Sequence, residues 1–584
     1  MKRMSLKLSP IILSVCLLVM GFAVFNYENN DNVAKAFSLP QTFDTTIKAL
    51  NYGETAVVNN TLIFINFSGE TNTLNIKNTL YDAYPYEVIE DTYNNSEYSV
   101  KSYFETTSNG KLSLRTNFLY NGTYGTPFTI SYSRDYFITG SGSTFTLTNA
   151  IWEAIKTDFI EYAKDYDLDA NDDGYVDSLT FLLTPDPEGR TVGWSTPLWA
   201  HSSTMTNLAS VTDNSGSSIT LGKYNLATVE IVDYKDGMIE QDPLVDSNGI
   251  KIAESSTYCH ELSHVLGLPD YYIYDTMFDN TLVDSEEVPV GVWDLMAYNY
   301  YQMPQHSLAY NKLQMGYIEE SNVVEITENN TYELYPVSYW ETHDITSLDV
   351  SAYFVRGKGE YSNQYFYIEY RSQDGLFDSK LPTSGLVVYR VDTNITSSYF
   401  TGVSAGNFMA PPYNIQIMRN EIISPITDTD LSYLGQGYAK MYTANNGRNF
   451  SYYKPSLKGA ESLIATGLDG HGLASIGNSI DGQAKVGVTS NYCNGHMVSL
   501  TWQSGDITYQ KYTGTNQGNI APEDIEYINT GIVIDVLEIT EDGKLKFQID
   551  WQELSDPEVE EEDVLIDSSL FEDVNLYNKL LDII

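Results

Sequence analysis

The sequence is poor in cysteine and in basic residues, and each shortage excludes a class of protein. Three cysteines occur in 584 residues, and Cys16 lies in an N-terminal apolar segment, so Cys259 and Cys493 cannot build a disulfide framework. We expect both as buried free thiols. Lysine and arginine number 32 against 78 acidic residues, which gives a net charge of −46. Such a surface repels nucleic acid and anionic lipid, so neither is an expected partner.

A long apolar run near the N-terminus, residues 11–25, follows three basic residues within the first seven. This order is typical of an export signal, and Ala34-Lys35-Ala36 offers a cleavage site. We therefore expect residues 1–36 to be a signal peptide. The mature chain would be secreted and extracellular or associated with the cell surface, with no stable membrane association. An uncleaved membrane anchor is the alternative, because the run is near the lower length limit for a span.

The remaining length exceeds one ordinary hydrophobic core, so two or more domains are expected. Helical and strand patterns alternate in the first half, whereas short strands rich in Tyr, Val, Ile and Phe dominate after about residue 323. We predict four parts: a linker or prosegment (37–58), a mixed domain (59–322), a β-rich domain (323–552), and an acidic linker and tail (553–584). Within them we predict strands at 61–67, 176–183, 198–201, 364–370, 386–391 and 545–551, and helices at 98–106, 147–165 and 255–266.

The most informative motif in the chain is H-E-x-x-H-x-x-G-x-x-D, which begins at His260. On a helix His260 and His264 lie one turn apart and share a face, so both imidazoles can reach one ion. Two histidines at this spacing suit Zn²⁺, and Glu261 between them can act as general base on a water molecule. The alternative is a helix with two ordinary surface histidines.

The end of this motif predicts a third metal ligand. Gly267 and Pro269 stop the helix and turn the chain. That turn can bring the Asp270 carboxylate back toward the two histidines and leave a fourth position for water. Whether Asp270 binds zinc directly or supports another ligand stays open from the sequence.

A second oxygen-rich segment lies between the predicted helix at 147–165 and the strand at 176–183. Carboxylate or amide side chains recur at nearly every second residue, and Gly174 allows a sharp turn, as in calcium-binding loops. The twelfth position is Thr180 rather than Glu, so this is not a full EF-hand; the alternative is an Asp-rich turn. The predicted calcium ligands are Asp167, Asp169, Asn171, Asp173 and Asp177.

A Met-containing turn is predicted about thirty residues after the zinc helix, in the segment Gly291-Val-Trp-Asp-Leu-Met-Ala-Tyr298. Metzincin-type zinc proteases place such a turn beneath the metal, and Met296 is the candidate here. Tyr298, two residues later, is a candidate catalytic group whose hydroxyl would stabilise the oxyanion formed when water attacks a carbonyl. The alternative is a hydrophobic turn of the core.

These motifs together resemble the immune-inhibitor-A family of secreted bacterial zinc metalloproteases. The resemblance spans much of residues 59–395 and is strongest in the H-E-x-x-H-x-x-G-L-P-D core and the tryptophan-containing turn after it. It implies an α+β zincin (metzincin-like) catalytic domain followed by an all-β, sandwich-like C-terminal domain. It also implies one catalytic zinc held by His260, His264 and Asp270, with Glu261 as base, and at least one structural calcium.

The sequence therefore predicts a zinc endopeptidase that hydrolyses peptide bonds in extracellular proteins, with protein or peptide substrates. Two alternatives stay open. One is a calcium-dependent surface binding protein on a zincin scaffold, and the other is a protease directed at glycoproteins whose β-rich domain holds a sugar.

Overall fold

The computed structural model describes twelve segments of the chain, and all of them lie in one compact unit, Thr42–Ile584. The predicted signal peptide, the acidic tail, Tyr298 and Cys493 lie outside the described residues. Among the described helices, none has both the length and the apolar character that a membrane span requires. The described segments are 56–190, 196–205, 209–229, 231, 243–272, 290–297, 303–356, 364–381, 384–393, 414–417, 473–476 and 532–551.

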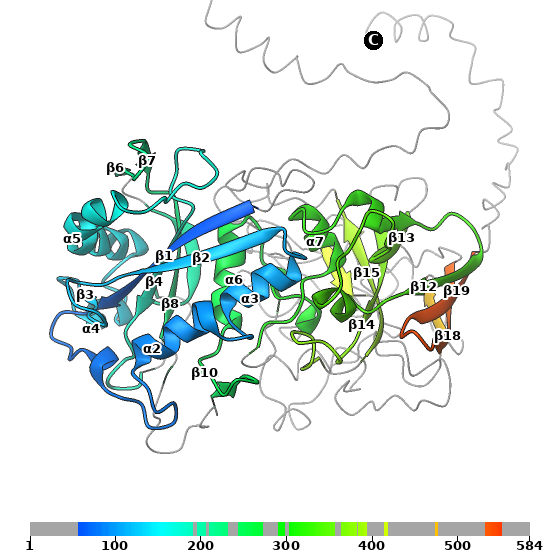
Figure 1. The fold of residues 1–584 in the computed structure, drawn as a ribbon, viewed down its shortest axis with the longest axis horizontal. Coiled ribbons are helices and arrows are strands. Elements are labelled where there is room, and N and C mark those ends of the chain that lie inside the picture. Colours follow the sequence, from blue (N-terminus) through cyan, green and yellow to red (C-terminus); the bar gives the residue numbers. More distant parts are fainter. Residues whose placement is uncertain are drawn as a thin grey trace, which may run out of the picture. The chain divides into compact units, whose positions relative to one another are not determined.

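The first half of the described chain is built on a mixed six-stranded sheet (Figure 1). Its main path runs β2-β1-β4-β8-β5. The first four of these strands are parallel, β5 is antiparallel to β8 at one edge, and the short β3 also pairs with β1. The strands are β1 (Ala56–Asn66), β2 (Leu112–Leu119), β3 (Phe128–Thr129), β4 (Ser178–Leu183), β5 (His201–Thr204) and β8 (Lys223–Thr228).

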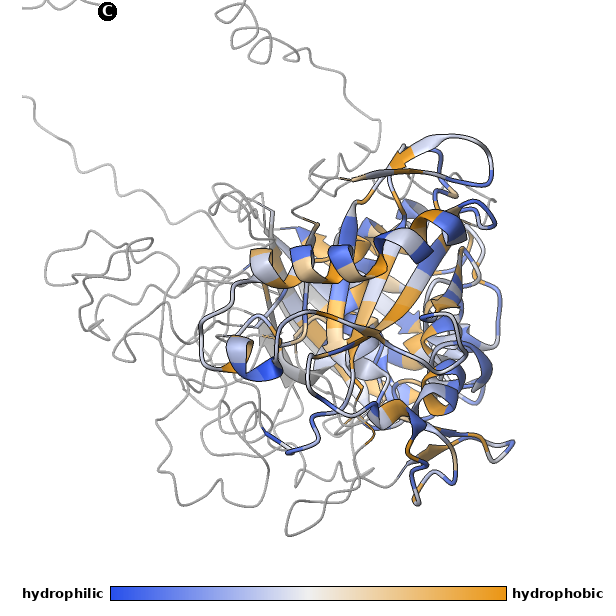
Figure 2. Cartoon of the chain, turned by 90° about the vertical axis from the view of Figure 1, so that its left-hand side faces the viewer, coloured by the Kyte–Doolittle hydropathy of each residue, from blue (hydrophilic) through white to orange (hydrophobic). Residues whose placement is uncertain are grey.

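Helices cover both faces of this sheet. α5 (Thr144–Ala163) begins at Ser143, whose side chain accepts a hydrogen bond from the Thr146 N–H, and packs its apolar side onto one face. α6 (Ser256–Val265) packs against β8, β5 and α3 (Val100–Thr107) on the other face. Figure 2 shows hydrophobic residues concentrated on the strands between these helices. Burial of this apolar surface is what fixes α6 against the sheet.

Alternation along the strands separates an apolar face from a partly polar one. Ile63 and Phe181 point into the apolar core under α5. On the opposite face the buried Asn60 side-chain oxygen accepts hydrogen bonds from the Ser178 and Thr180 hydroxyls, at 2.9 and 2.8 Å. Because successive strand residues face opposite sides, the polar residues can be buried without entering the apolar core.

Short elements connect and flank this sheet. They precede, bridge or border the strands and lie outside the main strand path. They are η1 (Thr73–Asn75), α2 (Pro85–Glu90), η2 (Asp91–Asn95), α4 (Arg134–Ile138), the hairpin β6 (Ser210–Thr212) and β7 (Ser218–Thr220), the pair β9 (Leu244–Val245) and β10 (Lys251–Ile252), and η4 (Gly291–Trp293).

Two further sheets follow in the second half. One has the order β11-β13-β14-β15-β16 and the other β12-β19-β18-β17, and ring contacts of Tyr353 with Tyr332 and Phe547 join them. The elements are α7 (Ala309–Gln314), η5 (Glu320–Asn322), β11 (Val323–Glu325), β12 (Asn330–Leu334), η6 (Val337–Glu341), β13 (Ala352–Arg356), β14 (Gln364–Arg371), β15 (Gly385–Asp392), β16 (Ile415–Ile417), β17 (Leu473–Ile476), β18 (Ile532–Ile539) and β19 (Leu545–Trp551).

Most predicted elements are confirmed to within a few residues, but one strand is wrongly placed. We predicted a strand over residues 198–201, whereas β5 starts at His201 and residues 196–200 form a turn. The reason is a local hydrogen bond from the Trp199 N–H to the Thr196 carbonyl, which bends the chain before the strand. The first strand begins at Ala56, three residues before the predicted start of the mixed domain at 59.

Candidate metal centre

A glycine in the left-handed backbone conformation ends α6. Gly267 has φ +108°, and its N–H bonds to the His264 carbonyl while the Leu268 N–H reaches back to the Ser263 carbonyl. This pair of bonds closes the helix in a Schellman motif, which suits glycine because it lacks a Cβ. The chain therefore reverses beside the last helical turn, and this reversal carries Asp270 toward the helix face that bears the histidines.

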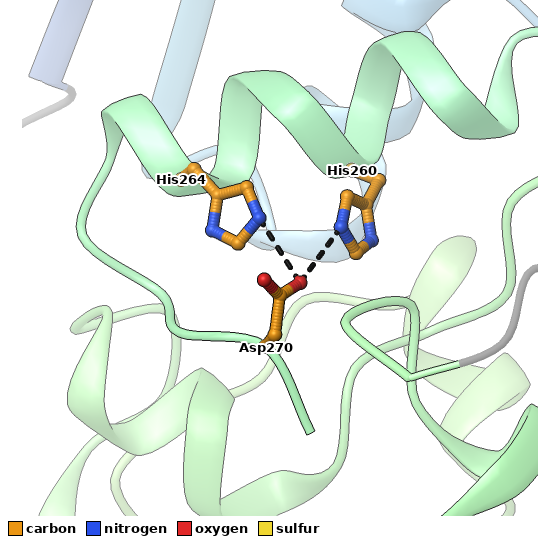
Figure 3. Close-up of side chains that lie close together, drawn as sticks. All are labelled: His260, His264 and Asp270. Atoms are coloured by element: carbon orange, nitrogen blue, oxygen red, sulfur yellow. Dashed lines mark ion pairs between the residues drawn. The ribbon is translucent and has the colours of Figure 1, made fainter. Parts of the chain in front are cut away.

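Three side chains converge below α6 (Figure 3). The Nε2 atoms of His260 and His264 lie 3.0 and 3.1 Å from the same Asp270 carboxylate oxygen. His260 and Asp270 are buried, and the His264 side chain is 14% exposed. Within the part of the chain that the structure describes, this is the one group of three His, Cys, Asp or Glu side chains placed to share a metal ion.

Both imidazoles are held by their other ring nitrogen. His260 Nδ1 lies 2.9 Å from the Leu295 carbonyl oxygen, and His264 Nδ1 lies 2.7 Å from the Leu268 carbonyl oxygen. A carbonyl can only accept, so each Nδ1 carries the proton and each Nε2 faces Asp270. This second hydrogen bond is what orients metal-binding histidines in proteins and fixes their tautomer.

Charge within the group opposes the effect of burial on the histidines. Burial alone would lower the pKa of His260 and His264, but the Asp270 carboxylate holds both pKa values above the ordinary one. Burial would likewise raise the pKa of Asp270, and the two imidazoles lower it well below its usual range. The group therefore favours positive charge at the point where the three side chains meet.

Glu261 is buried next to this group, and one of its carboxylate oxygens forms no hydrogen bond to the described residues. That oxygen is Oε2. Burial raises the pKa of Glu261 to about 8, with His260 opposing and Asp270 reinforcing the shift. A raised pKa makes this carboxylate a stronger base than that of an ordinary glutamate.

The predicted Met-turn supports the same histidine. Met296 is fully buried, and its N–H donates to the Asp294 carboxylate at 2.8 Å. The neighbouring Leu295 carbonyl is the one that holds His260. The predicted catalytic Tyr298 lies outside the described residues, so its position relative to this turn stays a prediction.

The predicted calcium loop has a different arrangement. The Asp169 carboxylate accepts from the Asp173 and Gly174 N–H groups, at 2.9 and 2.8 Å, and the Asp177 carboxylate accepts from Ala170 and from Asn59 of β1. Asp169 and Asp177 are buried, while Asp167 and Asp173 are exposed and Asn171 is half-buried. The two buried carboxylates therefore accept hydrogen bonds from backbone N–H groups of the loop and of β1.

One carboxyl group of the loop, that of Asp177, has a raised pKa. Burial, reinforced by the charges of Asp169 and Asp167, raises the pKa of Asp177 to about 7 against the hydrogen bonds from Asn59 and Ala170. A nearby cation would favour the ionised form. Calcium binding in this loop stays a prediction.

Two further residues, Asp294 and Arg371, border the site, and neither was predicted from the sequence. Both are completely buried, and both bond to the turn that holds His260. A signal was available for Arg371: Glu369 and Arg371 lie two residues apart in an apolar strand, which places opposite charges on one face. No family model matches this sequence, and no similar curated protein was found.

Proposed function

We propose that this protein is a secreted zinc-dependent endopeptidase that hydrolyses peptide bonds in extracellular proteins. The observation that carries the proposal is the convergence of His260 Nε2, His264 Nε2 and an Asp270 oxygen beside the buried Glu261. The resemblance of these motifs to the immune-inhibitor-A metalloproteases agrees with it.

The three side chains fit a tetrahedral zinc ion. Zinc binds imidazole nitrogen and carboxylate oxygen at about 2.0–2.1 Å, so neighbouring ligand atoms around it lie roughly 3.3 Å apart. The two nitrogen-to-oxygen distances here, 3.0 and 3.1 Å, are close to that value, and all three ligand atoms lie within 4.8 Å of one another. Three protein ligands leave a fourth position open, as in catalytic rather than structural zinc sites.

The chemistry divides between the ion and the protein. Zinc bound to these residues would acidify a water molecule and polarise the scissile carbonyl. Glu261 would take the proton of that water and pass it to the leaving amine, because its buried, unpartnered oxygen lies beside the three proposed ligands. The carbonyls of Leu295 and Leu268 would keep both imidazoles aimed at the reaction centre throughout.

The sheet offers a way to hold an extended substrate. β5 is the last strand on its side of the sheet, as far as the described residues extend, and α6 packs against it. A sheet edge presents backbone N–H and C=O groups that an extended peptide can pair with. This arrangement favours a polypeptide as substrate over a small molecule.

Calcium is the second proposed cofactor, held by the loop of Asp167, Asp169, Asn171, Asp173 and Asp177. This loop joins α5 to β4 of the central sheet. A cation there would stabilise the ionised form of the buried Asp177 and stiffen the connection. Extracellular fluid is rich in calcium, which agrees with the proposed secretion.

The test is metal content by mass spectrometry on the mature chain from Phe37, paired with casein cleavage by wild type and by Glu261→Gln. We expect one zinc per chain in both proteins, and a loss of cleavage of between about a hundredfold and ten-thousandfold in the variant. Glu153→Gln, an exposed glutamate on α5, is the matched control and should cleave like wild type. Equal cleavage by Glu261→Gln and wild type would contradict the proposal.

A further inference from the structure

The turn beneath the metal centre is bonded from four directions. Four consecutive carbonyls, those of residues 293–296, each accept a hydrogen bond from a different segment of the chain. Backbone carbonyls in a turn have no strand or helix ladder to bond to, so bonds from outside the turn decide where it lies. The Asp294 carbonyl also accepts a hydrogen bond within the turn, from the Ala297 N–H at 3.1 Å. Two of them lead toward the metal ligands and two lead away from them.

The two inner bonds reach the proposed zinc ligands. The Leu295 carbonyl accepts from His260 Nδ1 at 2.9 Å, and the Met296 carbonyl accepts from the Tyr271 N–H at 2.8 Å. Tyr271 directly follows Asp270 in the chain. The Leu295 carbonyl therefore fixes the ring of one proposed ligand, and the Met296 carbonyl fixes the backbone next to another.

The two outer bonds come from the second half of the protein. The Trp293 carbonyl accepts from Arg371 Nη1 at 2.6 Å, and Arg371 is the last residue of β14. The Asp294 carbonyl accepts from Gln305 Nε2 at 3.2 Å. The residues that hold this side of the turn therefore lie later in the chain, up to 78 positions away.

The Asp294 side chain ties the turn to α7. Its two oxygens accept from the Met296 N–H at 2.8 Å, the Leu308 N–H at 2.7 Å and Asn311 Nδ2 at 2.7 Å. Asn311 in turn accepts from the Tyr271 hydroxyl at 2.8 Å. A carboxylate is suited to this task because it accepts several hydrogen bonds at once.

Arg371 is held in one orientation by a buried partner. Its Nε and Nη2 atoms both lie 2.7 Å from oxygens of Asp378, and neither side chain is exposed. A second contact runs from Nη2 to the His306 carbonyl at 3.1 Å. The planar guanidinium fork can serve the carboxylate and two carbonyls simultaneously, which the single ammonium of lysine cannot.

We propose that Arg371 and Asp294 are positioning residues of the metal centre, and that the sheet containing β14 is a working part of that centre rather than a separate module. The inference rests on the proposed zinc site, but not on protease activity. Arg371 acts through the Trp293 carbonyl and Asp294 through the turn backbone, so that Leu295 and Met296 present their carbonyls correctly to His260 and Tyr271.

The test compares Arg371→Lys with a matched control, Arg356→Lys, which lies on the neighbouring strand β13 and is partly exposed. Arg371→Lys keeps the buried positive charge that Asp378 requires but loses the fork. Zinc affinity is measured by chelator competition on the folded proteins, and the visible spectrum of the Co²⁺-loaded protein reports ligand geometry. We expect a zinc affinity about 10–100-fold weaker and an altered Co²⁺ spectrum for Arg371→Lys, and no change for the control.

A residue that only stabilises the fold would lower the unfolding temperature and leave the zinc affinity of the folded protein unchanged. A zinc affinity of folded Arg371→Lys within twofold of wild type would therefore overturn the proposal. Should Arg371→Lys not fold, Asp294→Asn decides in the same way, because it replaces one accepting carboxylate oxygen with an amide NH2 group that can only donate. Either the Met296 N–H or the donors of Leu308 and Asn311 then lose their acceptor, and zinc binding should weaken about tenfold.

The proposed function can fail separately. A wild-type chain that binds zinc but cleaves no protein overturns the endopeptidase proposal, and the affinity ratios then still support or overturn the positioning role. A folded wild-type chain that takes up no zinc overturns both.

Discussion

Two segments of this chain carry regularly spaced side chains of the types that bind metal ions, yet their geometry differs. In the helical segment, side chains from residues 260, 264 and 270 meet at one carboxylate oxygen. In the loop between α5 and β4, Asp169 and Asp177 turn to backbone N–H groups instead. Both proposed metal sites were predicted from the spacing of their side chains. The same kind of spacing therefore leads to different side-chain arrangements in a helix and in a loop.

The difference lies in how much the backbone fixes. A helix places residues four apart on one face whatever the side chains do, so the histidine pair is preorganised before any ion binds. Aspartates in a loop have a competing option, because they can bond to nearby backbone amides and form turns. The helical group is therefore arranged for a cation in advance, whereas the aspartates of the loop must give up hydrogen bonds to backbone N–H groups before they can bind one.

The largest effect should come from removing a helical ligand. His264→Ala should weaken zinc binding by between about a hundredfold and a thousandfold, because each ligand contributes a few kcal/mol to a zinc site. The measurement is zinc affinity by chelator competition. Asp173→Asn in the loop is the control and should leave zinc affinity as it is. Equal losses in both variants would erase the distinction between the two segments.

The loop should respond to calcium instead. At a calcium concentration about one hundred times the dissociation constant, binding should stabilise the fold by about 2.7 kcal/mol, read as a rise in unfolding temperature over a chelator-treated sample. Asp169→Asn should remove this gain. Asp213→Asn is a matched control, since Asp213 also accepts turn N–H groups, from Ser215 and Ser217, outside the loop.

A calcium-induced gain that survives in Asp169→Asn would locate the binding elsewhere. The absence of any gain in wild type would leave the loop as an Asp-rich turn, which is the alternative that the sequence allowed.

A smaller effect should distinguish the two proposed zinc ligands on α6 from an ordinary buried histidine. His306 is buried between Lys312 Nζ, 2.9 Å from its Nδ1, and Glu341, 2.8 Å from its Nε2. Burial, reinforced by the Lys312 charge, lowers the pKa of His306 below 6.5. The unfolded chain therefore binds this proton more readily, and the stability that neutral His306 contributes above pH 6.5 is lost as the pH falls through that value.

Urea unfolding at pH 7.5 and 5.5 measures this loss. Wild type should lose up to about 1.4 kcal/mol more between these pH values than His306→Gln, whose amide can donate to Glu341 without titrating. An identical pH dependence in the two proteins would show that His306 does not titrate in this way.

The local parts of the site could be predicted from the sequence because each follows from short-range rules. The helix over 255–266 and its stop at Gly267 come from periodicity and capping, and they fix His260 and His264 on one face. β5 was placed too early because the turn at Thr196 and Trp199 has no strong sequence signature.

The parts that escaped prediction depend on contacts between distant segments. Arg371 lies 78 residues from the Trp293 carbonyl that it bonds, and nothing in local spacing relates the two. Asp294 reads as one polar residue in an apolar turn, and only the folded chain shows three donors around it. Residues that position a site are harder to predict from the sequence than the ligands, because packing between distant segments brings them together.

The central claim is that His260, His264 and Asp270 jointly hold one zinc ion. Anomalous diffraction at the zinc absorption edge, from crystals of the zinc-supplemented mature chain, tests it most directly. We predict a single strong peak about 2 Å from His260 Nε2, His264 Nε2 and an Asp270 oxygen. A well-ordered crystal with no peak at that position, or with the zinc bound elsewhere, would contradict the account.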